Sequence, residues 1–215
     1  MTHTQVCNLA LARLGEGRIM DVLQDNSAAA EGCRVLFEHT RNEILRSHPW
    51  NFAKKRATLS RLEADPTFTW TSYFQIPGDC LRILSINDTE IGDMIAEVWQ
   101  IEGRKILSDD EDTLNIVYVS NATTPDEWDV LFVEAFAVKL AAKLSEYLRG
   151  TTTKTAELME EYARLVAPLA RRIDSNETRG KTSLLPYNSL SVLSRGGGSG
   201  VSSIGSYFYR HVPGN

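Results

Sequence analysis

Apolar residues recur at helical spacing in the first fifty residues of the chain. They predict a helix over residues 4–14, which Gly15 is well placed to end, and a second helix from Asn26 or Ser27 to His48. Asparagine and serine are both good N-caps, because their side chains accept hydrogen bonds from the first free backbone N–H groups. The residues expected to face inward on these helices are Val6, Leu9, Ala10, Leu14, Cys33, Leu36, Phe37, Thr40, Ile44 and Leu45.

A second pair of helices is predicted beyond residue 120. A capping box that begins at Thr124 starts a helix that runs to about Arg149 and ends at Gly150. Its apolar residues cover more than one face, so we expect this helix to be the central one. A last helix is predicted over residues 154–174, with a kink at Pro168. Its expected inward residues are Leu158, Tyr162, Leu165, Val166, Leu169 and Ile173.

Between the two helix pairs, short segments alternate apolar and polar residues, which is typical of half-buried β-strands. The strand candidates are residues 52–59, 73–76, 81–86, 96–101, 104–107 and 114–119. Glu102-Gly103 predicts a hairpin, and Pro77-Gly78 predicts a type II turn with the glycine at positive φ. Connections this short favour antiparallel pairing, because parallel strands need long crossover segments.

Together these elements predict an α+β fold with an extended C-terminal arm. The N- and C-terminal helix pairs, in residues 1–50 and 121–175, form a helical bundle, and an antiparallel β domain is inserted at residues 51–120. Residues 176–215 hold seven glycines and eight serines but few apolar groups. Ordering so many small residues costs more entropy than their burial recovers, so we expect this arm to be flexible.

Composition and charge narrow the classes of function. The 215-residue chain is 42% hydrophobic and 24% charged, as is usual for globular proteins, and no apolar run approaches the roughly 20 residues of a membrane helix. Its three cysteines, an odd number, fit a reduced compartment. Residues 176–215 carry four basic side chains against one acid, whereas the rest of the chain carries 19 against 27. An acidic body argues against a sequence-independent DNA coat.

The candidate metal and cofactor sites are better explained as ordinary structure. His39 and His48 lie nine positions apart on one predicted helix, which does not suit a helical metal pair. The acidic run 109–112 lacks the central glycine and the terminal glutamate of a calcium-binding loop and favours a solvated turn. The glycine run 196–200 has no following lysine, which favours a flexible linker over a phosphate-binding loop. We expect no metal and no cofactor.

Catalytic patterns are equally sparse. Carboxylates in the predicted β domain, such as those of Asp93, Glu97 and Glu102, can be posed as a glycosidase pair. Sequence alone does not place two of them at the separation that such a pair needs. The chain has no G-x-S-x-G nucleophile motif. We therefore assign no catalytic residue and expect a protein that is not an enzyme.

Two aromatic features remain. Trp50 and Phe52 lie where helix passes into sheet, and we expect them to lock these two regions together. In the arm, apolar and aromatic residues are spaced along a glycine-rich segment with no local core to enter, which leaves two readings open: a disordered end, or a docking peptide that orders on a partner. The candidate partner-binding residues are Leu184, Leu185, Tyr187, Leu190, Val192, Leu193, Tyr207, Phe208, Tyr209 and Arg210.

Several ordered segments of the chain resemble one known family. The segments 7–15, 41–53 and 73–82, followed by the closing helix pair, are similar to those of the tail tubular protein A family, the head-to-tail adaptors of short-tailed bacteriophages. The likeness covers roughly residues 4–174. It does not extend to the arm, which is longer and richer in glycine than the family's pattern.

The resemblance implies a structural virion protein without catalytic chemistry. Such a protein forms a ring of about twelve copies between the portal and the tail nozzle, at the neck of the virion, after assembly in the host cytoplasm. Viral DNA passes through the ring without sequence-specific binding, and no membrane is involved. Because like charge keeps DNA from sticking, we expect an acidic channel lining. Some relatives are suggested to degrade cell-envelope polysaccharide, so a tail-associated hydrolase is the alternative.

Overall fold

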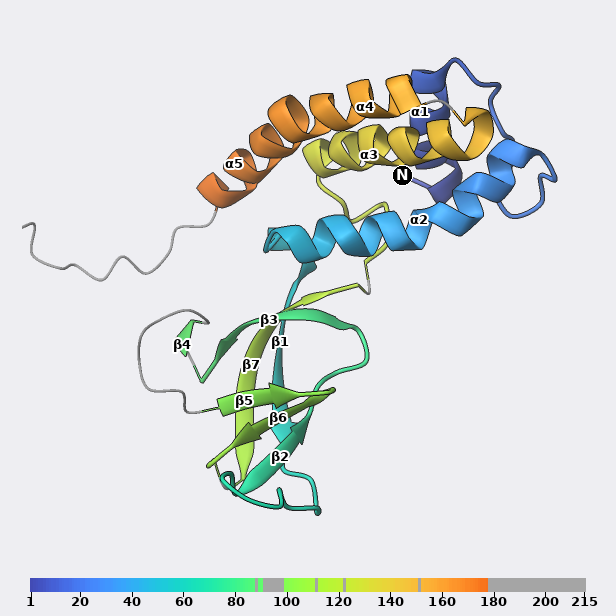
Figure 1. The fold of residues 1–215 in the computed structure, drawn as a ribbon. Coiled ribbons are helices and arrows are strands. Elements are labelled where there is room, and N and C mark those ends of the chain that lie inside the picture. Colours follow the sequence, from blue (N-terminus) through green and yellow to red (C-terminus); the bar gives the residue numbers. More distant parts are fainter. Residues whose placement is uncertain (88, 91–98, 111, 122, 151, 178–215) are drawn as a thin grey trace, which may run out of the picture. The chain divides into compact units, whose positions relative to one another are not determined.

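The computed structural model describes residues 1–87, 89–90, 99–110, 112–121, 123–150 and 152–177 (Figure 1). All the candidate partner-binding residues of the predicted arm lie outside these residues. The helices are α1 (His3–Leu14), α2 (Ala28–Ser47), the 3-10 turn η1 (Asn51–Ala53), α3 (Val130–Arg149), α4 (Thr152–Glu161), the π-helical turn η2 (Tyr162–Val166) and α5 (Ala167–Glu177). Together with two small antiparallel sheets, they confirm the α+β class.

The strands form two separate sheets, and every described pairing is antiparallel, as their short connections predicted. The strands are β1 (Lys54–Ser60), β2 (Ser72–Gln75), β3 (Cys80–Ile86), β4 (Thr89–Glu90), β5 (Trp99–Glu102), β6 (Lys105–Ser108) and β7 (Thr113–Ser120). Their orders are β1-β7-β3-β4 and β2-β6-β5. The predicted hairpin joins β5 to β6, with Gly103 at a φ of 58°.

The predicted type II turn at Pro77-Gly78 is wrong. The N–H of Cys80 donates to the carbonyl of Pro77 over 3.0 Å, so proline occupies the first position of the turn and not the second. Gly78 then sits at the second position, where a type I turn needs no positive φ, and it is not among the glycines with positive φ.

The first two helices follow their sequence signals closely. Gly15 ends α1 in the left-handed conformation, and the Ser27 hydroxyl caps α2 by accepting a hydrogen bond from the N–H of Ala30. The inward face of α1 differs in one respect: Leu9 is exposed, while Cys7 and Leu11 are fully buried.

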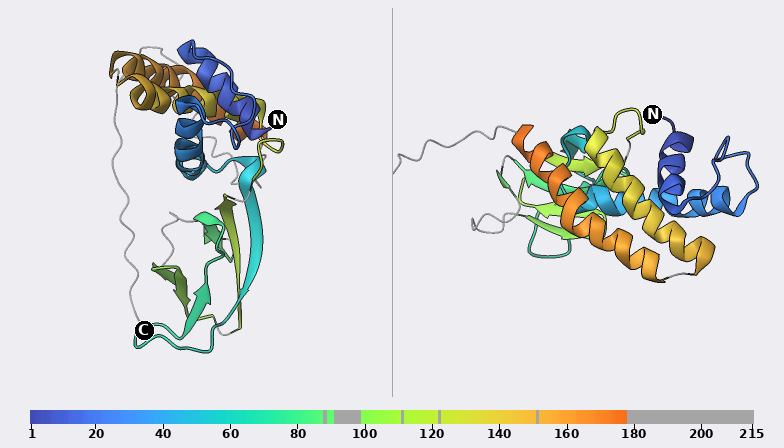
Figure 2. Two further views of the ribbon diagram at one scale, coloured as in Figure 1. Left: turned by 90° about the vertical axis from the view of Figure 1, so that its right-hand side faces the viewer. Right: turned by 90° about the horizontal axis from the view of Figure 1, so that it is seen from above.

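Helix α3 lies at the centre of the helical region, between α2 and the α4–α5 helix, and also contacts α1 (Figures 1 and 2). Twelve of its residues are buried, as its broad apolar surface predicted. Its predicted start is wrong, because Asp129 caps it by accepting from the N–H groups of Leu131 and Phe132. Thr124 and Glu127 form a separate turn, which lets the Trp128 ring enter the core between turn and helix.

The last helix contains a π-helical turn where the sequence predicted a proline kink. The N–H of Ala167 bonds to the carbonyl of Tyr162, five residues back. This wider turn lies directly before Pro168, whose ring would otherwise clash with a carbonyl in the preceding helical turn. The extra residue rotates the following helix by about 100° relative to a regular α-helix.

This rotation moves the predicted inward face of the last helix outward. Leu165, Leu169 and Ile173 are 67%, 42% and 37% exposed, so their assignment to the core is wrong. The buried positions lie one or two residues later in each case, as the added residue requires. They are Ala167, Ala170 and Asp174.

Candidate functional site

Most of the sequence-predicted candidate residues lie outside the described part of the chain. Of the three carboxylates considered for a glycosidase pair, Asp93 and Glu97 lie outside the described residues, and Glu102 is exposed on β5. The predicted partner-binding residues of the arm also lie outside. The candidate sites below therefore come from the described part of the chain.

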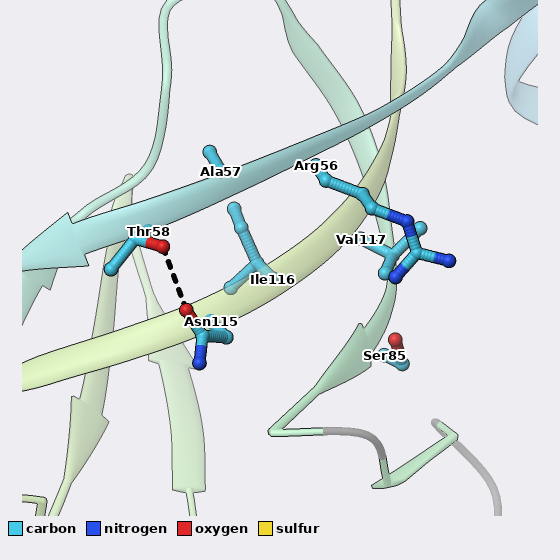
Figure 3. Close-up of a pocket in the computed structure, with 7 residues that line it drawn as sticks. All are labelled: Arg56, Ala57, Thr58, Ser85, Asn115, Ile116 and Val117. Carbon is cyan, nitrogen blue, oxygen red and sulfur yellow. Dashed lines mark hydrogen bonds between the residues drawn. The ribbon is translucent and has the colours of Figure 1, made fainter.

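A groove of about 370 Å³ lies on the sheet formed by β1, β7 and β3 (Figure 3). It is lined by Arg56, Ala57, Thr58, Ser85, Asn115, Ile116 and Val117. The Thr58 hydroxyl points toward Asn115 and donates a 2.7 Å hydrogen bond to its side-chain oxygen. Its described lining offers one guanidinium and several polar groups, which can hold an anion but supply no acid–base pair.

A second, mainly apolar pocket of about 560 Å³ lies between α1, the loop that follows it, and α2. Cys7 and Cys33 are among its lining residues, as are His3 and Phe37, whose ring centroids are 4.8 Å apart. The hydrogen bond between the two thiols, together with burial, raises the pKa of Cys7 and keeps it a protonated thiol. Among the described residues, no group of three side chains suitable for a metal ion occurs.

This pocket was not identified from the sequence, although the spacing of two of its residues indicates part of it. His3 and Cys7 are four residues apart and therefore share one face of α1. Nothing in the local sequence indicates that Cys33 of α2 would join them, because that contact depends on how the two helices pack.

Asp79 is held at the junction of β1, β3 and β7. Its carboxylate accepts hydrogen bonds from Ser120 at 2.8 Å, Lys55 at 3.1 Å and Tyr118 at 3.3 Å. Partial burial raises the pKa of Asp79, but the bonds from Ser120 and Lys55 outweigh it and leave this pKa below its usual value. All three donors point at one carboxylate, so the cluster ties strands together.

A second polar cluster joins the last helix to the α2–β1 connection. Asp174 of α5 accepts from the Asn51 N–H at 2.9 Å and lies 2.9 Å from His48 Nε2. Burial lowers the pKa of His48, and the neighbouring Asp174 offsets this only in part. Trp50 and Phe52 pack beside this cluster, each edge-on against Phe132 of α3.

In the helical region, exposed large aliphatic side chains are grouped in two places, besides separate ones such as Val35 and Val130. One is the α5 stripe, which consists of Leu165, Leu169 and Ile173. The other is the loop pair, Met20 and Leu23, which are 84% and 78% exposed in the loop between α1 and α2. Grouped apolar surface of this kind on a folded protein marks sites of interaction with other proteins.

Comparison with protein-family models finds no family that matches the chain, and no curated protein sequence matches it. Within the described part of the chain, none of the helices has the length and apolar character needed to cross a bilayer.

Proposed function

We propose that the chain is a head-to-tail adaptor of a short-tailed bacteriophage. In this role it forms a ring of about twelve copies at the neck of the virion, between the portal and the tail nozzle. Viral DNA passes through the ring during ejection without sequence-specific contacts. The chain acts through its surfaces and carries out no catalysis.

The observation that carries this proposal is the exposed α5 stripe. Three aliphatic side chains at positions i, i+4 and i+8 line one face of a helix whose opposite face is already packed. Leaving such a face in water forgoes about 25 cal/mol for each Å² of apolar surface, which a protein partner recovers. A ring-forming protein needs such surfaces on every copy.

The path of the chain supports the finer architecture that the order of the predicted elements indicated. Strand β1 leaves the helical region and β7 returns to it, and these two strands pair along their length from Lys54 opposite Val119 to Ser60 opposite Thr113. Entry and exit are thus adjacent, as in a domain inserted into a bundle of N- and C-terminal helix pairs.

The segments that carry the resemblance occupy structurally demanding positions, which also supports the proposal. Segment 7–15 covers most of α1 and its glycine cap, and segment 41–53 runs from α2 through η1. Segment 73–82 spans the turn from β2 into β3. Residues at these positions determine how the helices and sheets connect, so sequence similarity there favours a similar architecture.

Mass photometry of the purified chain, alone and with the portal protein, tests the proposal. We expect rings of many copies in at least one of these conditions, since ring closure can require the portal as a template. A chain that stays monomeric and never joins the portal would refute the function.

A truncation tests the proposed role of the arm. We propose that the arm binds the portal through its spaced apolar and aromatic residues, so removing residues 178–215 should weaken portal binding sharply. Since α5 ends at Glu177, the helices and sheets should remain folded. Portal binding as tight as that of the full chain would reduce the arm to a spacer.

A further inference from the structure

The α5 stripe is an apolar surface with basic side chains near its C-terminal end. Its three side chains extend along about 12 Å of helix. Arg172 is exposed beside it and Arg171 lies partly buried on the same helical segment, while the exposed Arg164 is paired with Glu160 at 3.0 Å. The basic charge is concentrated near Leu169 and Ile173, where Arg171 and Arg172 lie and the one nearby acid, Asp174, is buried, whereas Glu160 and Glu161 precede Leu165.

The loop pair has acidic side chains near it. The loop between α1 and α2 carries three carboxylates, those of Glu16, Asp21 and Asp25, against one basic residue, Arg18. Glu16 is already paired with Arg149 at 2.9 Å, which leaves Asp21 and Asp25 beside the loop pair. Its two apolar side chains are more exposed than any residue of the stripe. The stripe and the loop pair are thus both apolar, with Arg171 and Arg172 beside the stripe and Asp21 and Asp25 beside the loop pair.

The loop is held in one conformation, so the exposure of Met20 and Leu23 does not come from a loose segment. The Asn8 side chain bonds to both the N–H and the carbonyl of Ile19, at 3.0 and 2.9 Å. The Arg34 guanidinium donates to the carbonyls of Val22 and Asp25, at 2.7 and 2.8 Å.

These bonds keep Ile19 and Val22 buried, and the alternation along the loop turns Met20 and Leu23 outward. A surface already fixed in its binding conformation loses little entropy when a partner covers it.

The stripe and the loop pair lie on different parts of the helical region. Figures 1 and 2 show α5 at one end of this region and the loop after α1 at the other. They therefore cannot cover each other within one chain, but one copy can present its stripe to the loop of the next.

We propose that the α5 stripe of one copy packs against the loop pair of a neighbouring copy, with the arginines of the stripe beside the carboxylates of the loop. This contact joins two different surfaces, so it repeats from copy to copy and closes into a ring when its rotation permits. It deepens the adaptor proposal and rests on it, because it names the surfaces through which the ring forms.

Two variants of the full chain test this contact. The stripe variant combines Leu165→Ser, Leu169→Ser and Ile173→Ser, and the loop variant combines Met20→Ser and Leu23→Ser. Each is measured by mass photometry alone and with the portal protein, at concentrations where the wild-type chain assembles. We expect each variant by itself to associate at least tenfold more weakly than the wild type.

A mixture of the two variants provides the decisive result. The stripe variant retains an intact loop and the loop variant retains an intact stripe, so one contact forms between them and neither free end can extend it. We expect pairs and no larger assembly. A control with Phe68→Ser and Val130→Ser, which removes two other exposed apolar side chains, should assemble as the wild type does.

The remaining outcomes separate this contact from the adaptor proposal. Variants that assemble normally, or a loop variant that still pairs with itself, overturn the contact and leave the adaptor proposal standing. A stripe variant that self-associates but no longer joins the portal assigns the stripe to the portal and also overturns the contact. A wild-type chain that stays monomeric in both conditions removes the adaptor proposal and the contact together.

Discussion

The Glu43 carboxylate is expected to stabilise the packing of α2 on α3 by neutralising a buried lysine. Its two oxygens lie 2.7 Å from Lys139 Nζ and 2.6 Å from Lys143 Nζ. The Lys139 side chain is only 8% exposed, and its ammonium also lies 4.9 Å from the centre of the Tyr162 ring. Glu43→Ala would leave this ammonium buried with only the aromatic ring as a described partner.

The expected loss of stability depends on how exposed the Glu43 and Lys139 side chains are. Removing one member of a fully buried ion pair costs about 3–5 kcal/mol, whereas exposed pairs contribute about 0–1 kcal/mol. Glu43 is 44% exposed while Lys139 is buried, so water can reach the site only from one side. We expect Glu43→Ala to lower the free energy of unfolding by about 2 kcal/mol.

Urea unfolding followed by tryptophan fluorescence measures this change as a shift of the midpoint. Glu38→Ala is the matched control, because Glu38 is highly exposed and lies 3.9 Å from Arg41 on the same helix. Adding Lys139→Met to Glu43→Ala should recover most of the loss, since it removes the buried charge and keeps the volume. Equal losses for Glu43→Ala and Glu38→Ala, or no recovery with Lys139→Met, would refute the reasoning.

Three further predictions concern packing, pH and catalysis. Gly32→Ala should lower the free energy of unfolding by about 1–2 kcal/mol, because a Cβ there would lie 2.8 Å from Tyr147 and 2.9 Å from the buried Leu144. Gly78→Ala is the control, since a Cβ at Gly78 would meet open space. Equal urea midpoints for the two variants would contradict this prediction. Because burial lowers the pKa of His48, its contribution to stability should be complete above its ordinary pKa of about 6.5 and fall as the pH drops below it. His48→Gln should flatten that part of the stability–pH curve, and an unchanged slope would exclude His48 as the cause. The purified chain should leave peptidoglycan and capsule intact at every pH, and turnover that is lost on mutation of a carboxylate would favour the hydrolase alternative.

Elements whose signals are local were predictable from the sequence. Gly15 and Ser27 act on backbone groups within four residues, so α1 ends and α2 begins where these caps predicted. The β5–β6 hairpin likewise depends on the residues at its own turn. In contrast, the start of α3 was predicted at Thr124 from the sequence, whereas the helix begins after Asp129, where the buried Trp128 precedes its first turn.

The candidate sites were less predictable, because they depend on contacts between distant parts of the chain. Asp79 gathers donors from β1 and β7 that lie 24 to 41 residues away in sequence. Asp174 meets His48 across 126 positions. No spacing rule connects such residues, so only the packing of elements reveals that they act as clusters.

The last helix shows why an apolar pattern identifies a buried face without identifying what buries it. Leu165, Leu169 and Ile173 have the spacing of a core-facing stripe, and the sequence alone gave no reason to place them elsewhere. The π-helical turn supplies that reason, since it rotates small residues, Ala167 and Ala170, toward α3 and lets the helix pack closely without the larger side chains. The core of the single chain is therefore complete without the stripe. If a neighbouring copy covers it, the periodicity predicted burial correctly and erred only in assigning that burial to the chain's own core.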